Sequence, residues 1–451
     1  MFFIRCVQAV DRRLLSLLWL GLFLFLSAGS SSALAGGLRI DITKGGLTPL
    51  PIAIPSFVNL AGGGQASAGG TMGSQVADVV TADLERSGLF RPISKSAFLQ
   101  MPDHLLKNGP QFRDWRVIGA EALVSGAVRQ EGDQIIVDFF LYDVYQGNLI
   151  GKGKRFSAVA RNWRHVAHRV ADEIYTRLTG ETGYFTSRIS FVSHKGNLKQ
   201  ISIMDQDGAN RSDLTQGKDL VLTPRFSPDG DSLFYITYEN GAPRIARLNL
   251  LGGGSNILSD YPGLNSAPSW SPDGRRMAFT LSMDGNPEIY VRDLNGSHPT
   301  RLTDNPAIDT SPSWSPDGQK IVFNSDRAGT PQLYVMNAGG GEARRITFEG
   351  NYNAAPSWSP RGDLIAFVHG GGGRFRIAVI NPDGKNMRVL TDSWMDESPT
   401  WSPNGRVILF SRHNGSRSQL YSIDLTGYNE RLVPVGGDSE GSDPSWSPLI
   451  R

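Results

Sequence analysis

The stretch Pro312-Ser313-Trp314-Ser315-Pro316-Asp317-Gly318 decides the fold, because the second half of the chain repeats it. Two other copies match it closely, at 224–230 and 268–274, and three looser ones follow at 356–362, 399–405 and 444–448. The aromatic residues of the six copies are Phe226, Trp270, Trp314, Trp358, Trp401 and Trp446, spaced 44, 44, 44, 43 and 45 residues apart. A period of this length is typical of propeller blades.

Each period also contains short β-branched and aromatic runs separated by Gly, Asp or Asn. The runs of one kind contain Phe191, Tyr235, Phe279, Phe323, Phe367 and Phe410, and those of the next begin at Ile201, Ile245, Ile289, Leu333, Ile377 and Leu420. With the motif strand and a third short run, each unit holds about four strands. Six periods therefore predict an all-β six-bladed propeller.

The motif itself reads as scaffold. Pro presets the first turn position in Ser-Pro-Asp-Gly, and Gly supplies the left-handed residue that closes the hairpin. We expect its Trp to pack between blades. The alternative is a ring of aromatic side chains that grips a sugar or a base, which would not require the motif in every unit.

The phase of the repeat predicts how the ring closes. The first period starts at Arg188-Ile189-Ser190-Phe191 without a motif strand before it, whereas the last motif, around Trp446, has no strands after it. We therefore expect the strand near Trp446 to complete the blade begun near Ile189, which removes exposed sheet edges.

Residues 36–183 lack the period and predict an α/β domain with a mixed sheet and two main helices, followed by the propeller over 184–451. Apolar spacing predicts helices over 74–86 and 163–178, with Gly180 as C-cap. Strands are expected at 51–55, 122–129, 135–142 and 149–156, a Gly/Ala/Ser-rich loop at 61–73, and a linker at 181–185.

The N-terminus predicts a cleaved export signal over residues 1–35. Arg5, Arg12 and Arg13 precede or flank the apolar run 14–26, and Ala33-Leu34-Ala35 provides a small-x-small cleavage site. The chain carries 45 Lys+Arg against 43 Asp+Glu, and removal of three Arg and one Asp leaves 42 of each sign. Cleavage of this leader also removes Cys6, the only Cys in the sequence. We expect an exported monomer without disulfides, nucleic-acid partner or membrane insertion.

Searches for chemistry return weak matches. Gly437–Gly441 reads G-x-S-x-G, but no His follows it to complete a triad. His165 and His168 lack a Cys or a helical carboxylate motif for zinc and are expected to be a half-buried or surface pair. Asp205-Gln206-Asp207-Gly208 resembles the start of a calcium loop without its final acidic residue, so we expect a turn. No cofactor, metal site or catalytic residue is predicted.

The loops before each motif differ from blade to blade, although the scaffold positions repeat. Such differences are expected where a rigid ring presents different side chains to one asymmetric partner. They are also compatible with unconstrained loops. The first reading places a partner at the mouth of the propeller channel.

The signal, the α/β domain ending in 168–174 and Leu178-Thr179-Gly180, and the six repeats together resemble the TolB family, periplasmic components of the Tol-Pal envelope system. The resemblance implies a non-enzymatic scaffold that links the lipoprotein Pal at the propeller mouth to inner-membrane TolA, supporting outer-membrane integrity and constriction during division. It assigns TolA binding to Leu38, Arg39, Ile40, Asp41, Ile42 and Thr43. It assigns Pal binding to Leu264, Asn265, Ala267, Asp309, Thr310, Asn353, Asp396 and Glu397.

The matching stretch here, Leu38 to Gly45, alternates and is able to add a strand to a partner's sheet edge, and this mode of binding requires a free segment. Partner binding at the propeller is then expected to control its release from its own domain. Two other classes of function stay open from the residues alone: a secreted propeller hydrolase or lactonase, and a glycan-binding propeller module.

Overall fold

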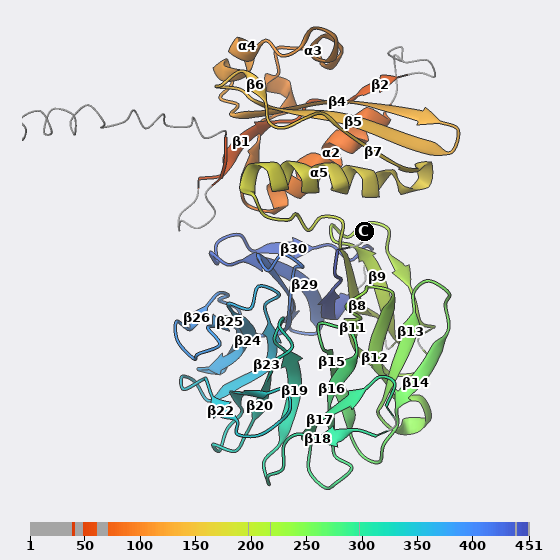
Figure 1. The fold of residues 1–451 in the computed structure, drawn as a ribbon, viewed down its shortest axis with the longest axis vertical. Helices are drawn as coiled ribbons and strands as arrows, with labels where there is room; N and C mark the ends of the chain where they lie inside the picture. The colour runs from red at the N-terminus through yellow and green to blue at the C-terminus, as the bar shows by residue number, and fades with distance from the viewer. Residues whose placement is uncertain are drawn as a thin grey trace, which may run out of the picture.

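The computed structural model describes residues 38–40, 48–60, 71–196, 198–216, 218–296, 298–437 and 440–449. The predicted leader 1–35 lies outside these residues. An α/β domain sits on one end of a propeller, with helices α2 and α5 between its sheet and the ring (Figure 1). This confirms the predicted fold class. Among the described residues, no helix is long and apolar enough to cross a membrane.

The N-terminal domain is built on a seven-stranded mixed sheet. Strand order is β3-β1-β4-β5-β6, with β2 paired to β4 and β7 to β5. Strands β1, β2 and β3 run parallel to their partners, and β5, β6 and β7 antiparallel. The elements are β1 (Leu50–Ala53), β2 (Val58–Leu60), α2 (Met72–Arg86), β3 (Phe90–Pro92), α3 (Pro102–Asn108), α4 (Phe112–Val117), β4 (Ala122–Glu131), β5 (Gln134–Asp143), β6 (Asn148–Leu149), β7 (Lys154–Val159) and α5 (Trp163–Thr179).

Both predicted helices form, and each buries the apolar stripe that predicted it. Val76, Val80 and Leu84 of α2 are fully buried, as are Val166 and Val170 of α5. The helix α5 ends where expected, because Gly180 adopts a left-handed conformation (φ 78°) and its N–H bonds to the Thr176 carbonyl.

Two of the predicted N-terminal boundaries are wrong. The expected strand 149–156 is split into β6 and β7, because Gly151 has φ 75° and breaks the extended backbone. The expected loop 61–73 ends earlier, since α2 already starts at Met72. Residues 61–70 of that loop lie outside the described part of the chain.

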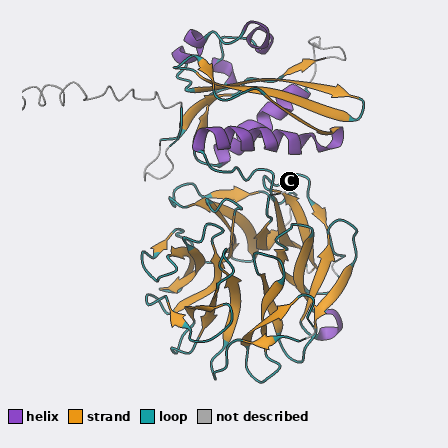
Figure 2. Cartoon of the chain, in the orientation of Figure 1, coloured by secondary structure: helices purple, strands orange, loops and turns teal. Residues whose placement is uncertain are grey.

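Six four-stranded sheets form the propeller, whose strands are orange in Figure 2, with one short helical turn at Glu239–Gly241. Blade 1 comprises β11 (Val221–Phe226), β12 (Ser232–Thr237), β13 (Arg244–Asn249) and β14 (Ser255–Ser259); blade 2, β15 (Asn265–Trp270), β16 (Arg276–Leu281), β17 (Glu288–Asp293) and β18 (Thr300–Arg301); blade 3, β19 (Asp309–Trp314), β20 (Lys320–Ser325), β21 (Gln332–Asn337) and β22 (Arg344–Arg345). Blade 4 comprises β23 (Tyr352–Trp358), β24 (Ile365–Gly371), β25 (Arg374–Ile380) and β26 (Arg388–Val389); blade 5, β27 (Asp396–Trp401), β28 (Val407–Asn414), β29 (Arg417–Asp424) and β30 (Arg431–Val433).

Blade 6 closes the ring as predicted. It joins β8 (Arg188–Lys195), β9 (Leu198–Asp205) and β10 (Ser212–Asp213) to β31 (Glu440–Trp446), with Trp446 paired to Ile189. The last described strand thus supplies the inner strand of a blade whose other strands come first in the propeller. Because the edge of β8 is paired, the ring has no open seam there.

The motif Trp side chains pack between blades, as expected. Trp314 lies in a core cluster with Ala278 and Ile289 of the preceding blade, and its indole N–H donates to the Ser269 carbonyl at 3.2 Å. The indole of Trp401 likewise donates to the Ser357 carbonyl at 2.9 Å. The repeat therefore encodes the seam between blades.

Candidate partner-binding surfaces

The two ends of the propeller have different neighbours. The Ser-Pro-x-Gly turns that end each inner strand face the N-terminal domain. Arg361 Nη1 bonds Glu181 of the linker at 2.9 Å, and Asn404 Nδ2 donates to the Thr182 carbonyl at 3.1 Å. We call this end the near mouth. The inner strands begin at the opposite end, the far mouth, where the predicted Pal-binding residues lie.

Four of those residues hold the first or second position of an inner strand and are fully buried. They are Asn265, Asp309, Asn353 and Asp396. Each is bonded within the chain. Asp309 accepts a bond from Arg327 at 2.7 Å, and Asp396 accepts two from Arg412 at 2.7 and 3.0 Å. Buried carboxylates need such partners, so these side chains fix the entry to each inner strand. Their contact with a partner protein stays a prediction.

The other four predicted residues are partly exposed. Thr310 Oγ1 accepts a bond from Asn324 Nδ2 at 2.6 Å, whereas Glu397 pairs with His413 at 3.2 Å. This hydrogen bond raises the pKa of His413 above its usual 6.5. Leu264 and Ala267 complete the set. These positions can be reached from the far mouth, unlike the buried four.

A ring of left-handed residues that sequence reasoning missed surrounds the channel. In every blade the residue before the motif proline has φ between 45° and 57°, and the strand register shifts there: Thr223, Ala267, Ser311, Ala355, Ser398 and Asp443. None is glycine, although this region is unfavourable for other residues. The backbone N–H of Ser311 faces Thr280 Oγ1 of blade 2 at 3.3 Å. The repeated bulge therefore links adjacent blades.

Large apolar side chains are exposed around the far mouth. Trp394 is 67% exposed, Phe348 70% and Ile308 49%, each on a loop that leads into an inner strand. Exposed aromatic residues are typical anchors of protein interfaces. The prediction started two residues too late to include Trp394. The sequence alone could have pointed to Trp394, because it is the only Trp of residues 184–451 that lies outside the repeated motif.

The predicted TolA-binding stretch begins in contact with its own domain. The N–H of Ile40 donates to the Leu178 carbonyl at 2.7 Å, and Ile40 is only 8% exposed. Leu38 packs on the same core, and the Arg39 guanidinium lies against Gly180. These contacts place residues 38–40 on the C-terminal end of α5. Asp41, Ile42 and Thr43 lie outside the described residues.

A buried polar cluster joins the domains at the near mouth. His168 Nδ1 lies 2.6 Å from Asp83 Oδ2, and Asp83 Oδ1 accepts a bond from Gln206 of the propeller at 2.7 Å. Burial lowers the pKa of His168, but the charges of Asp83 and the neighbouring carboxylates outweigh burial and raise it. The expectation of a half-buried or surface pair is wrong for His168, which is 2% exposed because α2 and the propeller cover it. Asp205–Gly208 forms the expected turn.

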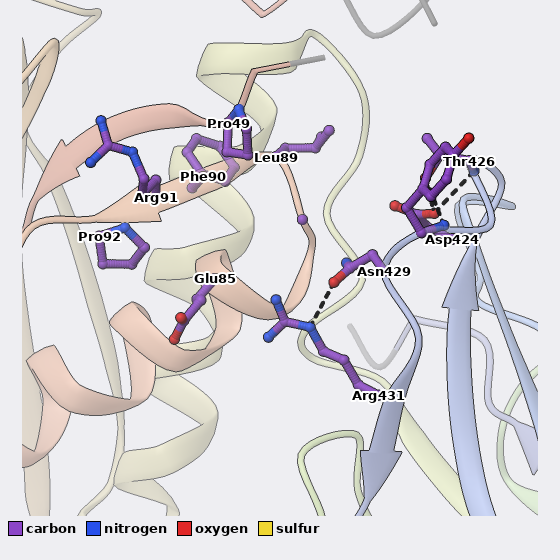
Figure 3. Close-up of a pocket in the computed structure, with 12 residues that line it drawn as sticks. Pro49, Glu85, Leu89, Phe90, Arg91, Pro92, Asp424, Thr426, Asn429 and Arg431 are labelled. Carbon is purple, nitrogen blue, oxygen red and sulfur yellow. Dashed lines mark hydrogen bonds between the residues drawn. The ribbon is translucent and has the colours of Figure 1, made fainter. Parts of the chain in front are cut away.

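A groove runs beside this cluster between the domains. One side is formed by Pro49 and 88–92, and the other by the β29–β30 loop with Asp424 and Thr426 (Figure 3). Arg431 Nε donates to Asn429 Oδ1 at 2.8 Å across its floor. Its walls bring together no nucleophile–base pair among the described residues. The segment Gly437–Gly441, set aside as a nucleophile motif, lies partly outside the description.

Comparison with known families follows the domain division. A family model described as the TolB beta propeller domain matches residues 175–450, and one described as the TolB amino-terminal domain matches residues 38–150. Both are consistent with the observed architecture. The predicted boundary between residues 183 and 184 falls between α5 and β8 and stays a prediction.

Individual proteins agree with these matches. The chain is 46% identical over 255 residues to the Tol-Pal system protein TolB of Paramagnetospirillum magneticum, covering 55% of this chain and 56% of the relative. It is 46% identical over 243 residues to that of Ruegeria sp., covering 53% and 54%. The chain thus spans about half the length of the curated relatives it matches. A crystal structure of TolB from Acinetobacter baumannii superposes with a TM-score of 0.79 at 33% identity, over 91% of this chain and all of that one.

Proposed function

The chain belongs to the TolB family of Tol-Pal system proteins, and from that premise we propose that it is a periplasmic scaffold that binds Pal at the far mouth and TolA through residues 38–43. The observation that carries this proposal is the exposed apolar rim of the far mouth. Three consecutive interblade loops expose Ile308, Phe348 and Trp394 to solvent at the same end of the propeller, a placement that favours an interface there.

The division of roles follows from the placement of the two surfaces. The far mouth lies at the end of the propeller opposite the N-terminal domain, so a partner there leaves that domain accessible. Residues 38–40 lie against α5 in the present conformation. Capture by TolA requires breaking the bond between Ile40 and Leu178 and exposing the Ile40 side chain again. Binding of TolA therefore competes with docking of the chain on itself.

Binding of soluble Pal to variants tests the role of the far mouth. We expect Trp394→Ala to weaken Pal binding about 30-fold or more, as truncation of a central aromatic anchor costs roughly 2 kcal/mol or more. Tyr428→Ala is the matched control, because Tyr428 is 94% exposed on the near side of the ring. Affinities are measured by isothermal titration calorimetry. Equal affinity of the wild-type chain and the Trp394 variant would contradict the proposal.

The TolA part is tested separately by deletion of residues 38–43. We expect this deletion to abolish TolA binding and to leave Pal affinity unchanged. Retention of TolA binding would refute the assignment of the segment. The two experiments fail independently, so each surface is judged alone.

A further inference from the structure

The ring nitrogen Nε2 of His168 is buried and has no hydrogen-bond partner. The side chain is only 2% exposed, on the face of α5 that meets the propeller. A buried imidazole nitrogen without a partner costs free energy unless something binds it. The groups that lie near Nε2 therefore indicate what kind of ligand could bind it.

Two carboxylates from the propeller approach this nitrogen. Asp205 Oδ2 lies 3.9 Å and Asp207 Oδ2 4.0 Å from Nε2; Asp205 is the last residue of β9 and Asp207 lies in the turn that follows. Ligand atoms of Asp83, His168 and Asp207 all lie within 4.8 Å of one another. Donors that share one ion at metal–ligand distances of about 2 Å lie up to about 4 Å apart. The separations are too long for direct bonds and suit a shared ion.

The contact with Asp83 fixes the protonation of the other ring nitrogen, Nδ1. A carboxylate oxygen only accepts, so the 2.6 Å contact between Nδ1 and Asp83 puts the proton on Nδ1. A cation bound at Nε2 then takes the place of the second ring proton, which is released when the metal binds. A carboxylate behind a metal-binding imidazole orients the ring and increases its basicity. Gln206 and Arg86 in turn hold the second oxygen of Asp83.

Two side chains compete for the same carboxylates. Asn210 Nδ2 donates to Asp205 Oδ2 at 2.7 Å, and the second is an arginine. Arg164 forms an ion pair with Asp207 Oδ2, and its own Nε is buried without a partner. The guanidinium supplies positive charge next to the carboxylate that a metal ion would use. Removal of this charge is expected to favour a metal ion at the cluster.

We propose that Nε2 of His168 and the carboxylates of Asp205 and Asp207 bind one divalent ion of the zinc class, oriented by Asp83. A nitrogen donor with carboxylates favours Zn²⁺, whereas Ca²⁺ and Mg²⁺ prefer oxygen ligands alone. The ligands come from both domains. Metal binding at this site clamps the α/β domain onto blade 6, independently of either partner surface.

Calorimetric titration with ZnSO₄ tests the site on the chain lacking only its predicted leader, after treatment with EDTA. We expect one Zn²⁺ per chain and no binding of Mg²⁺ at the same concentrations. His168→Asn removes Nε2 but keeps an amide donor toward Asp83, and should abolish binding. His165→Asn, one turn away on α5, is the matched control and should bind as the wild type does.

Three further variants keep the test decisive if His168→Asn fails to fold. Asp207→Asn should lose Zn²⁺ affinity by more than tenfold, and Asp83→Asn, which orients without ligating, by about 10- to 100-fold. Arg164→Gln should bind Zn²⁺ more tightly than the wild-type chain. Absence of a zinc-dependent signal in the wild-type chain, or equal affinity in the Asp207 and wild-type chains, would overturn the proposal.

Discussion

The Trp446 ring on the closing strand stands edge-on to Tyr184 in the interdomain linker, with ring centroids 5.7 Å apart and planes at 82°. Its indole N–H donates to Ser187 Oγ at 2.7 Å. One side chain therefore closes the ring and attaches the linker. The equivalent Trp270 makes no such bond, because its Nε1 is buried without a partner.

Because only Trp446 has a hydrogen-bond partner for its indole N–H, a Trp→Phe substitution should destabilise the protein more at Trp446 than at Trp270. We expect Trp446→Phe to lower the free energy of unfolding by about 1 kcal/mol more than Trp270→Phe, because only Trp446 loses a hydrogen bond. Chemical denaturation of both variants measures the difference. Equal losses would show that the bond to Ser187 adds nothing.

The ion pairs of Glu181 predict a pH-dependent contribution to stability. Burial raises the pKa of Glu181, but the bonds from Arg406 and Arg361 outweigh burial and hold the pKa below its usual 4.5. Because the pKa of Glu181 is lower in the folded protein than in the unfolded chain, its ion pairs stabilise the fold at pH values above the unfolded pKa. This stabilisation is lost as the pH falls through the folded pKa. We expect Glu181→Gln to cost about 1 kcal/mol at pH 7, less in high salt, and progressively less as the pH falls from 4.5 through the folded pKa.

Unfolding curves at pH 7 and pH 3 check this expectation. Asp363→Asn is the control, because Asp363 pairs with Arg361 at 3.4 Å without touching the linker. A constant cost of Glu181→Gln at both pH values would contradict the argument.

Two of the histidines near the far mouth, His413 and His369, are expected to have pKa values shifted in opposite directions from 6.5. The bond to Glu397 raises the pKa of His413, whereas burial lowers the pKa of His369. The stabilisation from the His413 pair is present below the unfolded pKa and is lost as the pH rises through the folded one. NMR titration should place His413 above His369. Glu397→Gln should lower the pKa of His413 and leave that of His369 unchanged. An unchanged pKa of His413 in this variant would disprove the pairing with Glu397.

The left-handed ring predicts the response of Ala267. Because φ is 49°, a β-branched residue is strained there, and we expect Ala267→Val to destabilise by about 1–3 kcal/mol. Ala267→Gly should stay within about 1 kcal/mol of the wild type, since glycine adopts this conformation freely. Thermal unfolding of both variants measures the effect. Equal stability of the Val variant would mean that the bulge rearranges.

Docking of residues 38–40 predicts a variant that binds TolA more tightly. A Cβ at Gly180 would collide with the Arg39 guanidinium, so Gly180→Ala should loosen the segment and raise TolA affinity. Gly109→Ala is matched for backbone strain, with φ 77° against 78°, but a Cβ there meets nothing. An equal effect of both variants on TolA affinity would exclude competition by docking.

The propeller was predictable because the aromatic residue and the Ser-Pro pair of the motif are local features that recur in six copies, with Trp in five of them and Phe226 in the first. The closure of the ring was predictable from the position of the motif within the repeat. The last motif, around Trp446, has no further strands after it, and the first period, at Ile189, has no motif strand before it. The split of strand 149–156 was not anticipated, because Gly151 in an apolar alternation is compatible with a continuous strand.

The sites were less predictable, because they depend on residues that are distant in sequence. His168 and Asp207 each belong to an incomplete metal motif in the sequence, and only the packing of α5 on blade 6 brings them together. Conversely, Asp309 and Asp396 were expected to face a partner, whereas arginines one strand away occupy their carboxylates. Sequence variation among loops locates a surface but does not show which side chains are free.

The pairing of β31 with β8 also sets the order in which the molecule is completed. The Arg188 N–H bonds Ser447 Oγ across 259 residues, so the loop that must close spans the whole propeller. Contacts of such long sequence separation form slowly, because the entropy of closure is lost before the contact stabilises the chain. The closing strand also follows every other described strand of the propeller in the sequence. Until it pairs, blade 6 keeps an open edge, which makes the incompletely folded chain vulnerable to aggregation and to proteolysis.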